Sequence, residues 1–353
     1  MMNAKRKAMA FEPEIKEPLT ASPGKPSEAP ALAAEDIELR SGGLSAEPIP
    51  SKELKSLRDH YQNHLASHAG IFDFSRVFPN TSNVQELVAQ VDDLKLCLDS
   101  FRPLNLAQAE NLQEAFDTEY TYDSNRIEGN TLTLMETHLV VNKGLTIGGK
   151  RMEEHLEAIN HKEAIDFIRD MATKNEDLNE YNLKLIQALV LRGIDRLNAG
   201  VYRNVPVYIS GSTFVPPQPY MISPMMEGYF EYYEKEKEKI HPVLLASEMH
   251  ERLVTIHPFI DGNGRTSRLV MNLVLLREGF PLTSISSKPE GRENYYNALQ
   301  TKQTGGSLDD FHRVVLLSVK DAFFRYLGAV AGGIGDSEAR KGSHFFNRIK
   351  DAL

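Results

Sequence analysis

Residues 256–268 read IHPFIDGNGRTSR, and they separate two stretches of sequence whose apolar residues recur at helical spacing. The stretch before them contains Leu245, Met249, Leu253 and Ile256, and the stretch after them contains Leu269, Val270, Leu273 and Val274. Pro258 and the Gly-Asn-Gly run at 262–264 interrupt the pattern. The segment therefore predicts a loop between two helices, with the second helix beginning near Arg265.

The residues of this loop suit a phosphate group. Residues 262–264 expose consecutive backbone N–H groups at a helix start, where the helix dipole also favours an anion. Arg265 and Arg268, three apart on one helix face, add two guanidinium groups. Asp261 beside them suits Mg²⁺ shared with substrate phosphates, and His257 could take a proton from a hydroxyl. Together these residues predict a site that transfers a group from a nucleotide polyphosphate.

Two other interpretations of the loop are weaker. A glycine cap, a solvated aspartate, surface arginines and a core-edge histidine are each ordinary, but their occurrence within twelve residues argues against coincidence. A zinc site would use His250 and His257, which a helix separates by roughly 10.5 Å. That spacing is too wide for two ligands about 2 Å from one metal. The sequence also lacks H-E-x-x-H and a Walker-type phosphate loop.

Most of the chain from Ser51 onward has helical spacing of apolar residues. One helix face carries Leu87, Val91, Leu94 and Cys97. Further helices are predicted over 106–128, from a capping box of Thr133 with Glu136, over 155–171 and over 183–197.

Residues 201–220 (VYRNVPVYISGSTFVPPQPY) are the exception, because β-branched and aromatic residues flank a Ser-Gly-Ser turn. This pattern predicts a hairpin that must pack on the helices. The predicted fold class is an all-α domain with a β-hairpin flap.

Composition sets the organisation of the chain and its surroundings. Residues 1–50 hold seven of the 18 prolines and one aromatic residue, which predicts a disordered tail. A single cysteine excludes an intramolecular disulfide and a cysteine-rich zinc site. No apolar run reaches the ~18 residues of a membrane span, and residues 1–11 lack the apolar core of a secretory signal. The net charge of −9 disfavours general nucleic-acid binding. We expect a cytoplasmic protein.

At this point the residues carry a family resemblance. The segment 257–268, HPFIDGNGRTSR, resembles the full signature of the Fic (Fido) family, HPFx(D/E)GNGRxxR, and the similarity extends from about Tyr120 to Leu327. The resemblance implies a protein adenylyltransferase, which moves AMP from ATP to a Ser, Thr or Tyr hydroxyl of a target protein and releases pyrophosphate. It divides the chain into an N-terminal helical region at 51–130, a catalytic core at 131–330 and a short tail at 331–353.

The same resemblance implies a role for each site residue. His257 is the general base, Asp261 holds Mg²⁺ against the α- and β-phosphates, and Arg268 reaches the γ-phosphate. The α- and β-phosphates are gripped by Gly262, Asn263, Gly264 and Arg265, with Thr266 beside them. The flap residues Ile209, Ser210, Gly211 and Ser212 border the nucleotide and register the target backbone by strand addition. The adenine pocket is walled by Tyr295 and Tyr296, which spacing alone would place in the core.

A carboxylate stands at the end of the helix predicted over 106–128, in the sequence SNRIEGN at 124–130. Glu128 there meets the negative end of the helix dipole, so a cationic partner would explain it. Alternatively, Asn125 caps a short turn that has Glu128 as its third residue. The segment resembles the family's inhibitory motif (S/T)xxxE(G/N), carried by Ser124, Glu128 and Gly129. The resemblance implies that Glu128 pairs with Arg268 and blocks the γ-phosphate, as in the class with an N-terminal brake.

Two alternative functions remain open. A carboxylate beside the phosphates could orient water, so that Glu128 would support removal of AMP from a modified target. A DNA-binding regulator built on a silent Fic core is disfavoured by the acidic charge and by the ~26 residues after Leu327, which are too few for a winged helix. A phosphotransferase relative is disfavoured because the GNGR pattern is intact. The resemblance allows a homodimer, and the chain itself is one candidate target.

Overall fold

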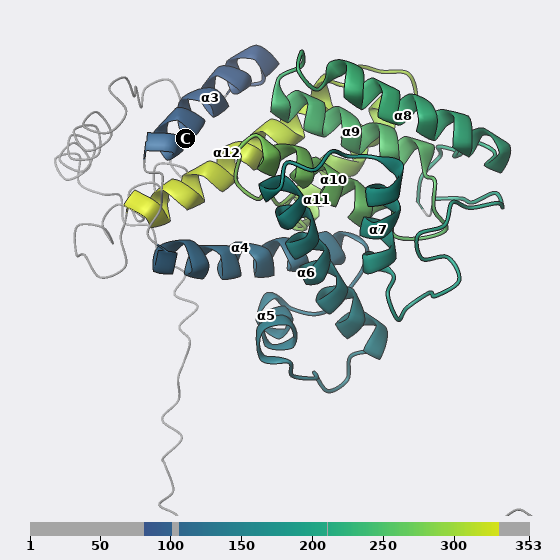
Figure 1. Ribbon diagram of the computed structural model, residues 1–353, viewed down its shortest axis with the longest axis horizontal. Coiled ribbons are helices and arrows are strands. Elements are labelled where there is room, and N and C mark those ends of the chain that lie inside the picture. The colour runs from purple at the N-terminus through teal and green to yellow at the C-terminus, as the bar shows by residue number, and fades with distance from the viewer. Residues whose placement is uncertain (1–80, 101–105, 210, 332–353) are drawn as a thin grey trace, which may run out of the picture. The chain divides into compact units, whose positions relative to one another are not determined.

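Helices make up the regular structure of the part of the chain that the computed structural model describes, residues 81–100, 106–209 and 211–331 (Figure 1). Their order is α3 (Val84–Ser100), α4 (Leu106–Ile127), α5 (Leu134–Lys143), α6 (Met152–Thr173), α7 (Glu180–Val190), the short 3₁₀ helix η1 (Pro219–Met221), α8 (Ile222–Glu236), α9 (Pro242–Ile256), α10 (Asn263–Arg277), α11 (Pro289–Gln303) and α12 (Asp309–Ala331). No strand occurs in these ranges, so the all-α prediction is confirmed. The tail predicted at 1–50, residues 51–80 and residues 332–353 lie outside the described residues.

Helix α10 forms the centre of the helical core. It packs against α9, α6, α7 and α4, and Figure 1 shows it surrounded by these helices. Its buried side chains point in all directions around the axis, which is typical of a helix enclosed by neighbours. The fully buried members include Leu269, Val270, Met271, Leu273 and Leu275. The N-terminus of α10, where the predicted phosphate loop ends, is therefore fixed by the core of the molecule.

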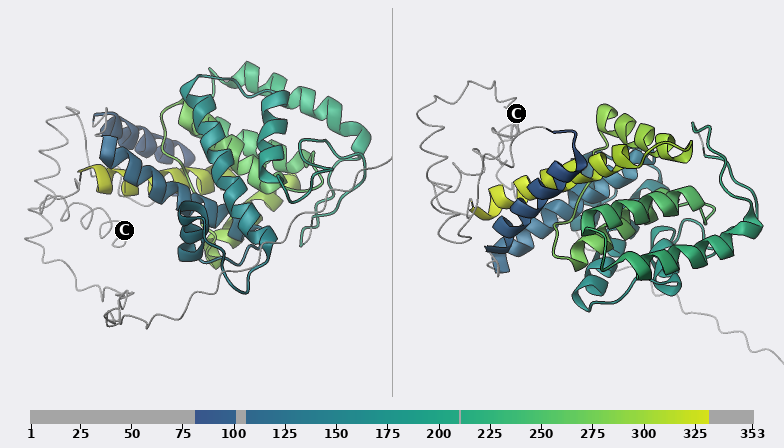
Figure 2. Two further views of the ribbon diagram at one scale, coloured as in Figure 1. Left: turned by 60° about the horizontal axis from the view of Figure 1, so that its bottom comes forward. Right: turned by 90° about the horizontal axis from the view of Figure 1, so that it is seen from above.

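Helix α4 brings the predicted inhibitory segment to that N-terminus. It packs against α5, α6, α10 and α12, and α3 packs along α12 (Figure 2). Tyr120 and Ile127 of α4 are buried in the main core cluster. The C-terminal end of α4 is therefore a core element that lies beside α10.

The start of α5 and the end of α7 can be compared with the helix boundaries predicted from the sequence. The capping box that opens α5 is present, because the Thr133 side chain accepts from Glu136 N–H and the Glu136 side chain accepts from Thr133 N–H. The helix predicted over 183–197 ends instead at Val190. The Asn160 side-chain amide donates to the carbonyls of Val190 and Arg192, at 3.3 and 2.6 Å, at the point where the helix was predicted to continue.

The hairpin predicted over 201–220 is wrong, because the described residues of this segment form a loop without paired strands. A turn is present at its tip, where Ser212 N–H donates to the Ile209 carbonyl at 3.1 Å. Proline lacks the N–H group that a strand ladder requires. The segment contains four such residues: Pro206, Pro216, Pro217 and Pro219.

The described helices include none that is long and apolar enough to cross a bilayer.

Candidate functional site

His257 ends helix α9 in a left-handed backbone conformation, with φ at 51°. Its backbone N–H donates to the Leu253 carbonyl at 2.9 Å, and its ring Nδ1 lies 3.2 Å from the Val254 carbonyl oxygen. A carbonyl can only accept a hydrogen bond, so Nδ1 carries the proton and Nε2 is the basic nitrogen of the neutral ring. The imidazole is thereby arranged to accept a proton from a group in the cavity that it lines.

The surroundings of His257 favour its neutral form. Burial lowers the pKa of the His257 ring below its ordinary value, and the Arg203 guanidinium acts in the same direction. The hydrogen bond to Val254 and the carboxylates of Glu128 and Asp261 raise the pKa, but they do not overcome burial. His257 is therefore neutral at physiological pH, which is the form that a general base needs.

The first turn of α10 lines the same cavity. Gly262 precedes the helix in a left-handed conformation with φ at 78°. Asn263 fixes the loop, because its side chain accepts from Phe259 N–H and donates to the Phe259 carbonyl, both at 2.9 Å. A helix N-terminus held in this way presents unpaired N–H groups and a positive dipole end to an anion.

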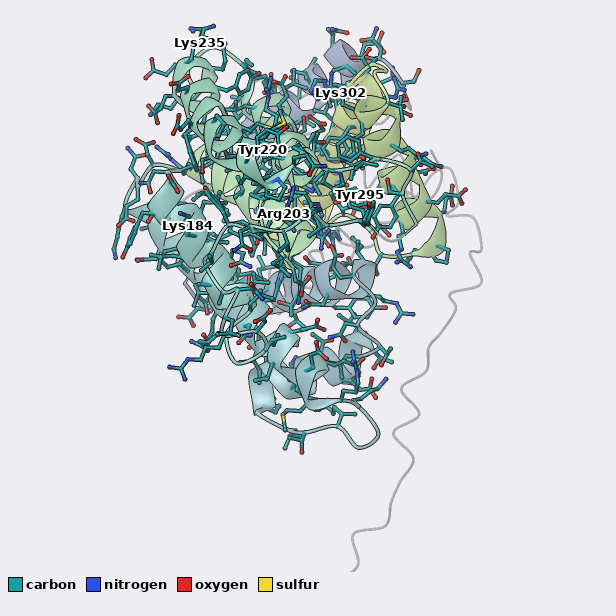
Figure 3. All side chains as sticks on the ribbon, turned by 90° about the vertical axis from the view of Figure 1, so that its right-hand side faces the viewer. Lys184, Arg203, Tyr220, Lys235, Tyr295 and Lys302 are labelled. Carbon is teal, nitrogen blue, oxygen red and sulfur yellow. The ribbon has the colours of Figure 1, made fainter. Side chains whose placement is uncertain are left out.

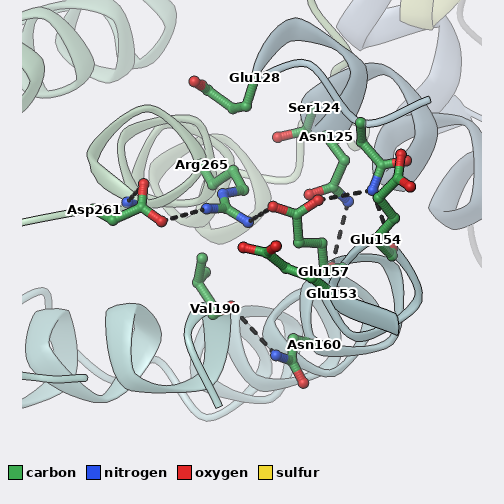
Figure 4. Close-up of polar contacts among 12 residues, drawn as sticks. Ser124, Asn125, Glu128, Glu153, Glu154, Glu157, Asn160, Val190, Asp261 and Arg265 are labelled. Atoms are coloured by element: carbon green, nitrogen blue, oxygen red, sulfur yellow. Dashed lines mark hydrogen bonds and ion pairs between the residues drawn. The ribbon is translucent and has the colours of Figure 1, made fainter. Parts of the chain in front are cut away.

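Arg265 lies between two carboxylates (Figure 4). Its Nη1 donates to Glu157 Oε1 at 3.1 Å, and its Nη2 donates to Asp261 Oδ2 at 3.2 Å. The Asp261 side chain is 58% exposed, and its Oδ1 accepts from Gly262 N–H at 2.6 Å. The buried Nε of Arg265 has no hydrogen-bond partner among the described residues. The positive charge of this guanidinium beside a helix N-terminus favours an incoming phosphate group.

Arg268 is completely enclosed by its own chain. Its Nε donates to Ser124 Oγ at 2.9 Å, and its Nη2 donates to the Ser124 carbonyl at 2.8 Å and to Glu128 Oε1 at 2.7 Å. Its Nη1 reaches the Tyr295 hydroxyl at 3.4 Å. The pairing of Glu128 with Arg268 that the family resemblance implied is therefore present. In this arrangement the guanidinium offers no open face to a phosphate.

Glu128 covers the start of α10 as well as Arg268. Burial opposes its ionisation, but the guanidinium groups of Arg268 and Arg265 outweigh burial and lower the pKa of Glu128 below its ordinary value. A Cβ built on Gly264 would collide with the Glu128 carboxylate. Glycine at position 264 therefore provides the space in which the carboxylate lies.

The turn after α4 holds Glu128 in place. Gly129 adopts φ at 102°, and its N–H donates to the Arg126 carbonyl at 3.0 Å. The Asn130 amide then donates to the Glu154 carbonyl at 3.0 Å and to Glu157 Oε2 at 2.8 Å. The turn that carries Glu128 is thus fastened to α6.

A cavity of about 1590 Å³ joins these parts. Most of the predicted site residues line it: Glu128, Gly129, Ile209, Gly211, Ser212, His257, Asp261, Gly262, Asn263, Gly264, Arg265 and Tyr296. Four others lie behind its wall: Ser124, Thr266, Arg268 and Tyr295. Ser210 lies outside the described residues.

The two tyrosines expected in the adenine wall are placed differently. Tyr296 is 40% exposed, lines the cavity and donates from its hydroxyl to the Ile127 carbonyl at 3.1 Å. Tyr295 is 1% exposed, and its hydroxyl lies 3.1 Å from His250 Nε2. Tyr295 therefore supports Arg268 from the core, as its spacing alone suggested, and does not border the cavity.

Three buried or half-buried residues of the site carry no signal in the sequence. Arg203 contacts the carbonyl of His257, Gln187 contacts the carbonyl of Asp261, and Glu157 contacts Arg265. Each contact joins residues at least 54 positions apart, so no local motif contains both partners. Gln187 also accepts from the Gly200 N–H, close to the root of the 201–220 loop.

Comparison with known proteins places this geometry in one family. A model of the Fic/DOC family matches residues 177–275. A protein adenylyltransferase Fic of Nematostella vectensis is 33% identical over 270 residues, which are 76% of this chain and 62% of that protein. The chain spans between 43% and 62% of the length of eight curated relatives with this name.

Solved structures of Fic proteins are also similar to this chain. A Fic-1 fragment from C. elegans superposes with a TM-score of 0.63 at 29% identity, over 70% of this chain and 72% of that one. A single-substitution variant of that fragment is 30% identical, with a TM-score of 0.61 over 69% of this chain and 72% of that one. A Fic-domain signalling protein from Bacteroides thetaiotaomicron superposes with a TM-score of 0.63 at 28% identity, over 71% of this chain and 99% of that one.

Proposed function

The chain belongs to the Fic family, and from this premise we propose that it is a protein adenylyltransferase that moves AMP from ATP to a hydroxyl of a target protein. One observation carries the proposal. The basic Nε2 of a neutral His257 and the N-terminus of α10 line the same cavity. A base and a phosphate-binding helix start that share a cavity are the two parts that transfer of a nucleotidyl group to a hydroxyl requires.

The reaction follows from the chemistry of these residues. His257 removes the proton from the target hydroxyl as its oxygen forms a bond to the α-phosphorus of ATP. The bond from the α-phosphorus to the oxygen that bridges to the β-phosphate breaks, and pyrophosphate leaves with the electron pair. The N-terminus of α10 and the Arg265 guanidinium stabilise the negative charge on the phosphates.

Asp261 fits the Mg²⁺ that this family uses. Its carboxylate is a hard oxygen ligand that is more than half exposed to the cavity. The described residues contain no group of three acidic or histidine side chains that could hold a metal alone. Mg²⁺ is commonly bound by one carboxylate with substrate phosphates, which is the arrangement Asp261 allows. Bound there, the ion would neutralise phosphate charge.

The resting state follows from the position of Glu128. Its carboxylate occupies the donors of Arg268 that the γ-phosphate would use, so ATP binds without the geometry that transfer needs. Glu128 is thus the brake of this enzyme.

Incubation with ATP labelled on the α-phosphate, Mg²⁺ and a cell lysate tests the proposal. We expect the Glu128→Gly variant to label protein bands, including its own, far more strongly than the wild type. Adding His257→Ala should lower labelling by about 10²–10⁴-fold, the usual contribution of a general base. His138→Ala, a half-buried histidine of α5 outside the cavity, is the matched control and should leave labelling unchanged. If the Glu128→Gly variant labels no protein, including itself, the proposed transferase activity is refuted.

Removal of AMP is a second candidate, favoured by the exposure of Glu128. Its carboxylate is 33% exposed and lines the cavity, and its lowered pKa keeps it ionised and able to orient water. A target labelled by the Glu128→Gly variant can be incubated with the wild type and with Glu128→Gln. Loss of label with the wild type alone would establish removal, and stable label with both would exclude it.

A further inference from the structure

Arg203 joins the loop at 201–220 to the catalytic segment. This side chain lies near the start of the loop and is 3% exposed (Figure 3). Its Nε donates to the His257 carbonyl at 2.7 Å, and its backbone N–H donates to the Pro258 carbonyl at 2.9 Å. Its Nη1 donates to the Val205 carbonyl at 3.0 Å and its Nη2 to the Pro217 carbonyl at 2.6 Å. One guanidinium thus reaches both arms of the loop and the backbone of the general base.

We propose that Arg203 is a positioning residue that couples the loop at 201–220, which presents the target hydroxyl, to the catalytic histidine. The inference rests on the proposed transfer reaction. It assigns to Arg203 two separate tasks, which are to hold the two arms of the loop together and to hold His257 in its catalytic conformation.

The first task arises because the described residues of the loop form no strand ladder. Its arms cannot exchange the backbone hydrogen bonds of a hairpin, and the planar fork of Arg203 bridges them instead. Near the tip of the loop, Ile209, Gly211 and Ser212 line the same cavity as His257 and the start of α10. Without the bridge at its root, the tip would lose its fixed distance from His257.

The second task arises because His257 is not glycine. A side chain in the left-handed region costs roughly 1–3 kcal/mol and persists only where its surroundings hold it. Arg203 holds the carbonyls of His257 and of the next residue from one side, and the Leu253 carbonyl holds the His257 N–H from the other. The ring is therefore aimed into the cavity by contacts outside its own loop.

The charge of Arg203 provides a readout that a purely structural role would not give. Three charged groups act on the ring: Arg203 lowers the pKa of His257, and Glu128 and Asp261 raise it. A base works only when it is neutral, so the transfer rate falls as pH decreases through the pKa of His257. Removing the positive charge should raise that pKa and move the acidic limb of the rate profile to higher pH.

The experiment uses the full chain with Glu128→Gly, so that the brake does not obscure the rates. Arg203→Lys keeps the charge and loses the fork, and Arg203→Gln loses both. We expect each to lower kcat/KM for the protein target by about 10²-fold, the cost of misplacing reacting groups by ~1 Å, with little change in KM for ATP. Only Arg203→Gln should move the acidic limb to higher pH. An NMR titration of the His257 ring, assigned by comparison with His257→Ala, should show the same upward shift without any turnover.

Arg277→Gln is the matched control. Arg277 also makes three side-chain hydrogen bonds, to Asp177, Tyr233 and Asn175, but it lies at the far end of α10. If both Arg203 variants keep the kinetics and the His257 titration of the Glu128→Gly parent, the inference is wrong. It is also wrong if Arg277→Gln shows the changes expected of the Arg203 variants. If Glu128→Gly itself transfers no AMP, the proposed function fails, and the NMR titration still decides whether Arg203 sets the state of His257.

Discussion

At the scale of single residues, Gly264 and Glu128 share one space. A Cβ at position 264 would overlap the Glu128 carboxylate, and its next neighbour would be Arg268 Nη1 at 3.2 Å. Gly264 has no left-handed conformation that would itself require glycine. Glycine at position 264 therefore leaves room for the Glu128 carboxylate, and its substitution should act through Glu128.

This overlap predicts an energetic coupling. Gly264→Ala alone should destabilise the fold, because the new methyl group displaces Glu128 from its buried cationic partner. In the Glu128→Gly background the methyl group no longer meets the carboxylate, and its remaining close neighbour is Arg268 Nη1 at 3.2 Å. The cost should therefore be smaller there, and alanine is also the better helix former. The difference between the two effects should be about 1–3 kcal/mol, measured by urea unfolding of both single variants and the double variant.

Gly228→Ala serves as the control for this cycle. Gly228 is a helical glycine of α8 with open space around its Cα, so alanine there should stabilise both backgrounds equally. Equal effects of Gly264→Ala in the two backgrounds would show that the brake does not occupy this space.

The sequence could predict the residues of the site that are contiguous. His257, Asp261 and Arg265 fall in one loop with a glycine run, so their chemistry can be inferred without a fold. Arg203 and Glu157 could not be found in this way, because each is an ordinary residue type within an ordinary segment. Their roles come from contacts across 54 and 108 positions of the chain.

At the scale of elements, the Asn130 side chain helps to fasten the end of α4 to α6. The Asn130 amide donates to both the Glu154 carbonyl and the Glu157 carboxylate on α6. Glu157 in turn holds Arg265. The turn that carries Glu128 and the Arg265 side chain are therefore both hydrogen-bonded to Glu157 of α6.

Asn130→Ala should loosen the brake without removing it. We expect transfer of labelled AMP to rise several-fold above the wild type and to stay below that of Glu128→Gly, because Glu128 remains but its turn is less constrained. Asn160→Ala is the matched control, since Asn160 is another buried asparagine whose amide bonds two backbone carbonyls, here at the end of α7. A wild-type rate in Asn130→Ala, or an equal rise in Asn160→Ala, would contradict this role.

Helix prediction succeeded where the apolar period was unbroken and failed where a distant side chain decided the end. The helices predicted from 106, from Thr133 and over 155–171 are all present as α4, α5 and α6. Helix α7 ended seven residues early because Asn160 captures its last carbonyls. The hairpin was predicted from β-branched composition, but the prolines removed its donors.

At the scale of the whole molecule, charge limits the partners. The chain carries 49 acidic and 40 basic residues. A protein that neutralises DNA phosphates releases counterions, so its affinity falls steeply with salt. A net charge of −9 works against this driving force.

We therefore expect no salt-sensitive retention on immobilised duplex DNA. The protein should pass through such a column at about 50 mM salt, whereas a basic DNA-binding domain run in parallel should elute only as the salt rises. Retention that a salt gradient releases would revive the alternative of a DNA-binding regulator built on a silent core.

The enclosure of Arg268 bears on what the enzyme responds to in a cell. Under the proposed function, ATP can occupy the cavity while Glu128 keeps Arg268 from the γ-phosphate, so a rise in ATP concentration does not by itself separate Glu128 from Arg268. Changes in the ATP level of the cell would then leave the rate of AMP transfer nearly unchanged. The rate of AMP transfer would instead depend on events that displace the last turn of α4. Under the proposed function, activity would therefore respond to mechanical or binding signals and not to the ATP level of the cell.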